Sequence, residues 1–358
     1  RNQELLRRLL SDPNSVDFVV RRSPFFENYI QQSDIAIAKV LAGRYLIAYA
    51  TQEVFATVRS ILGSGFISIS SIVLGLLDRP SLEASGIIQV QEQPFLQLRG
   101  SGVLIGFVDT GIDYTLDCFK YEDGTSKIRY IYDMTAEGPP PTGYYIGVEY
   151  PQEQINAALA SDDPFSVVPS TDTSGHGTYL ASVAAGREVG DFVGAAPDAE
   201  IIAVKLSRAR PYYLNLYSVP ETQEYAYESS TVMLGIEYIL ERSRELRRPV
   251  AICIALGSNF GSHDEFSIFA EYLSSVANLI GVCLCVAAGN ESQARHHLQG
   301  VISSAGEIQN IDIKVGENAG DVFMSLWTDV ADRVSVSVRS PTGELVGRIP
   351  AISGLSVR

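Results

Sequence analysis

The chain has 358 residues, of which 46% are hydrophobic, and its 42 acidic and 27 basic side chains give a formal net charge of −15. This acidity argues against nucleic acid or an anionic membrane surface as a partner, because both bind clustered Lys and Arg. The apolar content excludes a chain that is disordered throughout, four cysteines are too few for a disulfide scaffold, and no apolar run is long enough to span a membrane.

Residues 1–95 are predicted to form a small α+β domain. Apolar runs with strand character alternate with a segment that has helical spacing, and Gly and Pro separate them. The predicted elements are a strand at 45–49, a helix at 52–62, a strand at 66–77, a short helix at 81–84 and a last strand at 87–91.

Residues 100–305 alternate near-continuous apolar runs with amphipathic segments. This pattern predicts an α/β domain with a parallel sheet that helices cover on both faces. One helix is expected to be capped by Ser230 and to stop before Pro249, so that the arginines near its end face the negative pole of its dipole. We interpret these arginines as helix-end residues and not as a binding patch. The predicted strands are 102–108, 199–206, 250–256 and 281–287, and a second helix is predicted at 265–277.

The pattern changes over residues 306–358. Apolar and polar residues alternate at 311–315 and at 334–338, and Pro341-Thr342-Gly343 reads as a turn. We expect antiparallel β structure here, as the beginning of a β-rich domain inserted after the α/β domain.

The first candidate catalytic residue is Asp109, in the segment Val108-Asp109-Thr110-Gly111 at the end of a predicted buried strand. Functional side chains gather at the carboxyl ends of strands in open α/β sheets. The same Asp-Thr-Gly triplet also occurs in aspartic proteases. Those enzymes need a second carboxylate in a matching motif, and the sequence holds no second Asp-Thr-Gly or Asp-Ser-Gly.

Two further segments carry groups suited to acyl transfer. His176 stands between Gly175 and Gly177 at a predicted helix start, and an imidazole placed in this way is a common general base. Asn290 follows the strand 281–287 directly after two small residues and a glycine. A side-chain amide at a strand exit can donate to a developing oxyanion.

Together these segments resemble the subtilisin-like serine proteases. The resemblance covers about residues 100–305 and implies that Asp109 is the catalytic acid, His176 the base and Asn290 the oxyanion donor. The segment Leu256-Gly257-Ser258 is similar to the family's strand that pairs with extended substrate. The chain order Asp, His and then a later Ser is also that of the subtilisins.

The resemblance also assigns roles to the flanking regions. Residues 1–95 are similar to a propeptide that assists folding and inhibits the enzyme, with residues 87–93 as its last strand and tail. A β insert after the oxyanion Asn resembles the jelly-roll-like insert of the clostridial Csp germination proteases. This subgroup implies a polypeptide substrate, activation of another hydrolase during spore germination, and a spore-associated location; secretion and a cytoplasmic location stay as alternatives.

The nucleophile departs from the pattern, because no Gly-Thr-Ser-x-Ala motif occurs in the 358 residues. We expect the catalytic Ser downstream of residue 358. The alternative is an inactive pseudoprotease that binds or senses a partner.

We expect no cofactor and no metal site. Cys283, Cys285, His296 and His297 are compatible with zinc, but small buried cysteines are the more ordinary use of this residue. Calcium occurs in subtilisin-like folds, yet no oxygen-rich loop here can be assigned to it.

Overall fold

The structure is a computed structural model. It divides into two compact units, Arg1–Leu76 and Leu77–Arg358. The residues that the structure describes are 2–12, 15–41, 45–62, 86–144 without 94 and 97, 146–209, 214, 217–220, 223–227, 229–258, 268–287, 295–317, 322, 324–329 and 331–350.

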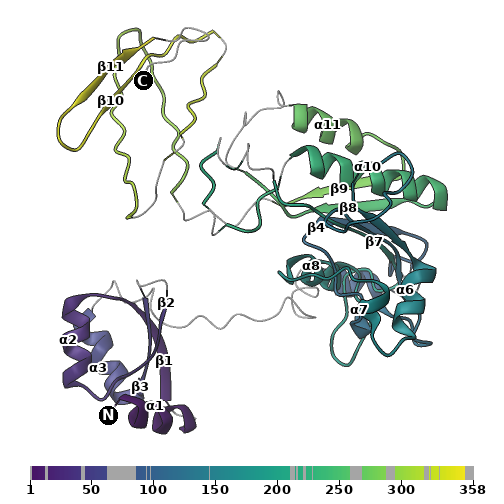
Figure 1. Ribbon diagram of the computed structural model, residues 1–358. Coiled ribbons are helices and arrows are strands. Elements are labelled where there is room, and N and C mark those ends of the chain that lie inside the picture. Colours follow the sequence, from purple (N-terminus) through teal and green to yellow (C-terminus); the bar gives the residue numbers. More distant parts are fainter. Residues whose placement is uncertain are drawn as a thin grey trace. The chain divides into compact units, whose positions relative to one another are not determined.

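The first unit contains a three-stranded antiparallel sheet with the strand order β1-β3-β2. The predicted strand at 45–49 and helix at 52–62 are confirmed as β3 and α3, whereas 66–77 and 81–84 lie outside the described residues. Side chains from the sheet and from α2 and α3 form one apolar core. The elements, labelled in Figure 1, are α1 (Asn2–Ser11), β1 (Ser15–Arg21), α2 (Pro24–Gln32), β2 (Ala36–Leu41), β3 (Tyr45–Thr51) and α3 (Gln52–Leu62).

The predicted last strand at 87–91 is wrong, because these residues form the short helix α5 (Ile87–Gln91). Ile88 is buried against Val193, and three residues later the Gln91 side chain is buried as well. The Gln91 Nε2 donates to the carbonyl oxygens of Gly194 at 2.9 Å and Ala195 at 2.8 Å. The three-residue spacing of the two buried side chains fits a helix, whereas successive residues of a strand alternate between its faces.

The second unit is built on a six-stranded sheet with the order β6-β5-β7-β4-β8-β9. All neighbouring pairs are parallel except β5 with β6. The four predicted strands are confirmed as β4, β7, β8 and β9. The strands are β4 (Leu104–Asp109), β5 (Ile128–Asp133), β6 (Val148–Pro151), β7 (Glu200–Lys205), β8 (Val250–Ile254) and β9 (Val282–Val286).

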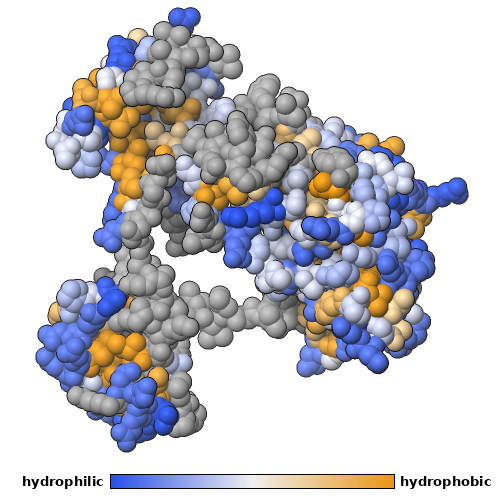
Figure 2. Space-filling view, in the orientation of Figure 1, coloured by the Kyte–Doolittle hydropathy of each residue, from blue (hydrophilic) through white to orange (hydrophobic). Residues whose placement is uncertain are grey.

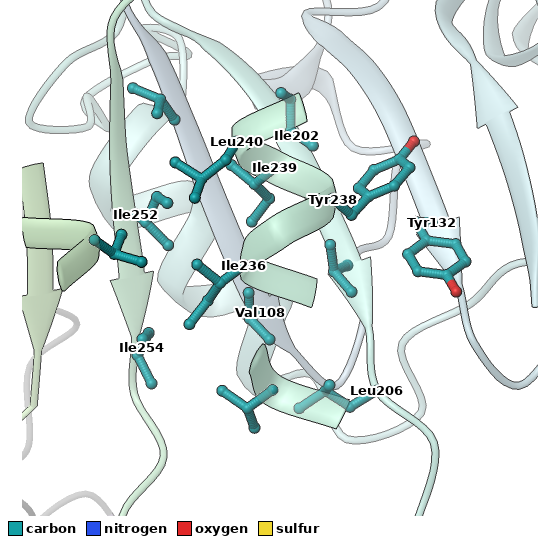
Figure 3. Packing of buried hydrophobic residues seen from close by; sticks show 14 of the residues in the cluster. Val108, Tyr132, Ile202, Leu206, Ile236, Tyr238, Ile239, Leu240, Ile252 and Ile254 are labelled. Atoms are coloured by element: carbon teal, nitrogen blue, oxygen red, sulfur yellow. The ribbon is translucent and has the colours of Figure 1, made fainter. Parts of the chain in front are cut away.

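Helices cover both faces of this sheet, as the alternating pattern predicts (Figure 1). On one face α10 (Ser229–Leu246) packs Ile236 and Ile239 against Val108 and Ile252, as Figure 3 shows. On the other face α8 (His176–Ala185) contributes Ala181 to the second core. Each buried strand therefore supplies apolar side chains to both cores, which explains its continuous apolar sequence. The other elements are η2 (Asp117–Phe119), α6 (Gln152–Leu159), α7 (Pro164–Val167) and α11 (Ile268–Ala277).

The start of α10 differs from the prediction, whereas its end at Leu246 lies before Pro249 as predicted. The helix already includes Ser229, so Ser230 lies inside it and is not its cap. Near its other end, Arg242 Nε donates to Glu149 Oε2 at 2.7 Å, and Arg248 Nε donates to the Gly102 carbonyl at 3.0 Å. These two arginines therefore connect the helix end to other elements, beyond any interaction with its dipole.

Residues 336–349 form an antiparallel hairpin of β10 (Val336–Arg339) and β11 (Leu345–Ile349) around the predicted turn. The predicted strand at 311–315 is not present. A strand is stabilised by pairing with another strand, and no described strand pairs with these residues. Their apolar side chains are about half exposed, and Figure 2 shows apolar surface in the region of the hairpin.

Candidate active site

Asp109 is the last residue of β4, a central strand of the sheet, and only 2% of its surface is exposed. Its Oδ1 accepts a hydrogen bond from the backbone N of Thr110 at 2.8 Å. The carboxylate therefore sits at the carboxyl edge of the sheet, as the sequence predicts. A buried carboxylate needs such partners to offset the loss of hydration.

His176 is the first residue of α8, and the helix starts there because Gly175 adopts φ 78°, a left-handed conformation that glycine tolerates. The His176 Nδ1 lies 2.7 Å from Asp109 Oδ1. A carboxylate accepts at this distance, so the proton sits on Nδ1 and Nε2 is left as the acceptor. With 44% of its side chain exposed, the imidazole is held on one side by the buried acid and is accessible to a reacting group.

The sequence analysis did not identify Asp172, although it contacts both segments that carry the Asp–His pair. Its Oδ1 accepts from the Thr110 hydroxyl at 2.8 Å and its Oδ2 from the Thr178 hydroxyl at 2.7 Å. Only its position four residues before His176 hints at a role at the helix start.

Leu256, Gly257 and Ser258 leave β8 at the same edge of the sheet as Asp109. Leu256 is half-buried against the α10 core, whereas Gly257 and Ser258 are exposed. The next strand leaves at this edge too, since the Ala287 backbone N donates to the Ile254 carbonyl at 3.0 Å. Asn290 lies outside the described residues.

Tyr227 is a second residue that the sequence analysis missed. Burial raises its pKa to about 12, and the charges of Asp109, Tyr225 and Asp172 add to the increase. The ring is half-buried against the α10 core. The phenol therefore stays neutral at neutral pH and adds no negative charge beside Asp109.

The far end of α8 is held by a buried lysine. Lys127 is 1% exposed, and its Nζ donates to the Ala185 carbonyl at 2.7 Å and to the Pro197 carbonyl. A cation is favourable at the C-terminal end of a helix, where carbonyl groups lack partners. Lys127 thus fixes the end of the helix whose first residue is His176.

Within the described ranges, no group of three or more His, Cys, Asp and Glu side chains is arranged to hold a metal ion. The Sγ atoms of Cys283 and Cys285 lie 3.9 Å apart, so both point to one face of β9, and both residues are exposed. In the same ranges, no helix combines the length and the apolarity needed to cross a membrane.

The comparison with solved structures returned the CspB protease of Clostridium perfringens, at 31% identity and a TM-score of 0.59. The alignment covers 77% of this chain and 54% of that chain, so this chain spans about half the length of the protein it matches. A psychrophilic protease matches at 20% identity over 57% of this chain and 52% of the other, with a TM-score of 0.36. Sphericase matches at 21% identity over the same shares, with a TM-score of 0.34.

The search of functionally curated proteins found no match to the chain. The sequence profile of the subtilase family, however, matches residues 100–316, which include the six-stranded sheet, Asp109 and His176. The resemblance and the α/β fold that it implies are thereby confirmed. The chain belongs to the subtilase family.

Proposed function

We propose that the protein is a serine endopeptidase that hydrolyses peptide bonds through an Asp-His-Ser triad. The observation that carries the proposal is the 2.7 Å contact between His176 Nδ1 and the buried Asp109 Oδ1. A base oriented by a buried acid is the arrangement that activates a serine hydroxyl. Membership of the subtilase family supports the same reaction.

In this mechanism Asp109 holds the imidazole with its proton on Nδ1 and stabilises the imidazolium that forms. His176 Nε2 takes the proton from the serine hydroxyl as Oγ attacks the scissile carbonyl, and later gives it to the leaving amine. The Asn290 amide donates to the oxyanion of the tetrahedral intermediate, an interaction worth about a hundred- to a thousand-fold in rate.

We place the nucleophile outside these 358 residues, because none of their serines stands in a Gly-Thr-Ser-x-Ala motif. In the chain order of the subtilisins, the serine follows the acid and the base. The protein of Clostridium perfringens with a similar structure is about twice the length covered by the alignment, which supports a further segment in the active enzyme.

The substrate is proposed to be an extended polypeptide that pairs with Leu256-Gly257-Ser258 as an added strand. Two observations support this role. The segment has no secondary structure of its own, and a Cβ at position 257 would meet no atom of the described residues within 4 Å. A peptide can therefore approach the backbone at Gly257 without displacing neighbouring side chains.

Residues 1–95 are proposed to be a self-cleaved propeptide that assists folding and inhibits the enzyme. The separate compact unit Arg1–Leu76, with its own sheet and core, supports a detachable domain. If cleavage is autocatalytic, the full-length chain is processed during expression and the His176→Ala variant stays intact. Cleavage that persists in the variant would contradict self-processing.

For the physiological role we propose limited proteolysis of a hydrolase precursor during spore germination. The support is the similarity to the CspB protease at 31% identity and the resemblance to the Csp group. Conversion of a purified precursor to one discrete product by the full-length enzyme is the expected result. Complete digestion, or no cleavage, would count against a role in activation.

The deciding experiment is fluorophosphonate labelling of the full-length gene product, with the labelled peptide mapped by mass spectrometry. The proposal expects the label on a serine beyond residue 358 and its loss in the His176→Ala variant. A folded, processed product that takes no label would reject the endopeptidase and favour the pseudoprotease.

A further inference from the structure

Asp172 lies outside the Asp–His pair, yet its two carboxylate oxygens face different segments. Oδ1 accepts from the Thr110 hydroxyl at 2.8 Å and from the Gly175 backbone N at 2.9 Å. Oδ2 accepts from the backbone N of Thr178 at 2.9 Å and from its hydroxyl at 2.7 Å. The carboxylate therefore joins the loop after β4 to the first turn of α8.

This connection matters because Gly175, which precedes α8, has no side chain to cap the helix. The first backbone N–H groups of a helix need acceptors from elsewhere. Thr110 Oγ1 accepts from the Gly177 N at 3.0 Å, and Asp172 accepts from the Thr178 N. A carboxylate also complements the positive N-terminal end of the helix dipole. The turn that begins with His176 is thus held by two residues outside the helix.

Thr110 carries the connection on to the catalytic acid. Its backbone N donates to Asp109 Oδ1 at 2.8 Å, the same oxygen that lies next to His176 Nδ1. A hydroxyl has one proton to donate. Donation to Asp172 therefore directs the lone pairs of the Thr110 hydroxyl toward Gly177.

The protonation state of Asp172 agrees with a role as acceptor. Burial raises the pKa of this carboxyl, but hydrogen bonds from Thr178, Thr110 and Gly175 together lower it by more than burial raises it. The net effect is a lowered pKa. The group is ionised at neutral pH, so both oxygens only accept. In all four of its hydrogen bonds the Asp172 carboxylate is the acceptor.

We propose that Asp172 is a positioning residue of the active site. It fixes Thr110 and the first turn of α8 so that the His176 ring meets Asp109 with its proton on Nδ1. The consequence for catalysis rests on the proposed function, whereas the effect on the imidazole requires no peptide hydrolysis.

Asp172→Asn separates this role from simple helix capping. If the amide oxygen faces the Thr178 N–H, the cap of α8 is kept. The amide NH2 then faces the Gly175 N–H, and the acceptor for Thr110 is lost. Asp123→Asn is the matched control, because Asp123 also accepts from a threonine N–H and hydroxyl, both those of Thr125, but is exposed.

The first measurement is the tautomer of His176 in the full-length chain labelled with 15N-histidine. The 358 residues contain four histidines, and the signal of His176 is assigned by its loss in His176→Gln. The expected result for Asp172→Asn is a fall of about tenfold in the ratio of the Nδ1–H to the Nε2–H form, which equals ~1.4 kcal/mol. Asp123→Asn leaves the ratio unchanged.

The second measurement is peptide hydrolysis by the same variants. We expect Asp172→Asn to lower kcat by about tenfold or more with KM within a factor of two, because misplacement of a catalytic group affects the chemical step. Thr110→Val removes the hydroxyl that donates to Asp172 and accepts from the Gly177 N, while Asp172 itself is kept. If Asp172→Asn does not fold, Thr110→Val must show the same two changes.

An unchanged tautomer ratio in a folded variant overturns the proposal. So does lower thermal stability with the tautomer ratio and kcat unchanged, because that result shows a helix cap only. If the unaltered full-length chain hydrolyses no peptide while the tautomer ratio falls in Asp172→Asn, the positioning role stands and the endopeptidase function fails.

Discussion

The backbone of Gly177 in α8 packs directly against the carbonyl oxygen of Gly111 in the loop after β4. A Cβ at position 177 would overlap that oxygen and would lie 3.2 Å from the Cβ and Oδ1 of Asp109. Glycine is required here because the helix and the loop approach closely, and this approach allows His176 to reach Asp109.

Gly177→Ala is therefore expected to destabilise the protein, although alanine is ordinarily the better helix former. Overpacking of a buried site costs about 1–3 kcal/mol, and urea unfolding measures it. Gly347→Ala serves as the control, because a Cβ there would meet no atom within 4 Å among the residues that the structure describes. Equal stability of the Gly177→Ala variant and the unaltered chain would contradict the close approach.

Asp109→Asn tests the orientation of the imidazole. An amide NH2 facing Nδ1 favours the tautomer that carries its proton on Nε2, so the base loses its acceptor. Loss of the acid in a serine-protease triad lowers kcat by about 10⁴. Peptide hydrolysis and the 15N tautomer measurement should change together. A variant that keeps both properties would show that Asp109 does not orient His176.

Lys127 gives the stability a defined pH dependence. Burial lowers the pKa of Lys127 to about 8, whereas an unfolded lysine titrates near ~10.4. Below about pH 8 both states hold the proton. Between these values the unfolded chain binds more protons, so the free energy of unfolding rises with pH.

From pH 7.5 to 9.5 the unaltered chain is therefore expected to gain up to ~2 kcal/mol of stability relative to Lys127→Met. Urea unfolding at the two pH values measures the gain. Lys314→Met, at an exposed position, should follow the unaltered chain. A difference between Lys127→Met and the unaltered chain that stays constant over this range would rule out the lowered pKa.

Gln91 attaches α5 to the segment before β7. Gln91→Ala removes both hydrogen bonds to the carbonyls of Gly194 and Ala195, and buried groups that lose a partner cost about 1–3 kcal/mol. We expect a lower melting temperature and faster hydrogen exchange at 87–91. Gln89→Ala, at an exposed position on the same helix, should change little. Unaltered exchange in Gln91→Ala would refute the attachment.

The sequence by itself determined four of the six strands of the sheet and the placement of the Asp–His pair. The strands at 104–109 and 200–205 are largely buried, and the residues of 250–254 are buried or half-buried, so their apolar runs are continuous. The strand at 282–286 is an apolar run as well, although three of its five residues are exposed. Asp109 follows such a run, and His176 follows a glycine that starts a helix. Both positions are set by neighbours in the sequence.

The tertiary structure alone decided the features that depend on distant partners. Residues 87–91 are a helix because Gln91 meets carbonyl groups about a hundred residues away, and 311–315 has strand alternation but no described strand to pair with. The cap of α8 comes from Thr110 and Asp172 and not from Gly175. Periodicity reports which side chains are apolar, but hydrogen-bond partners are fixed only when distant segments meet.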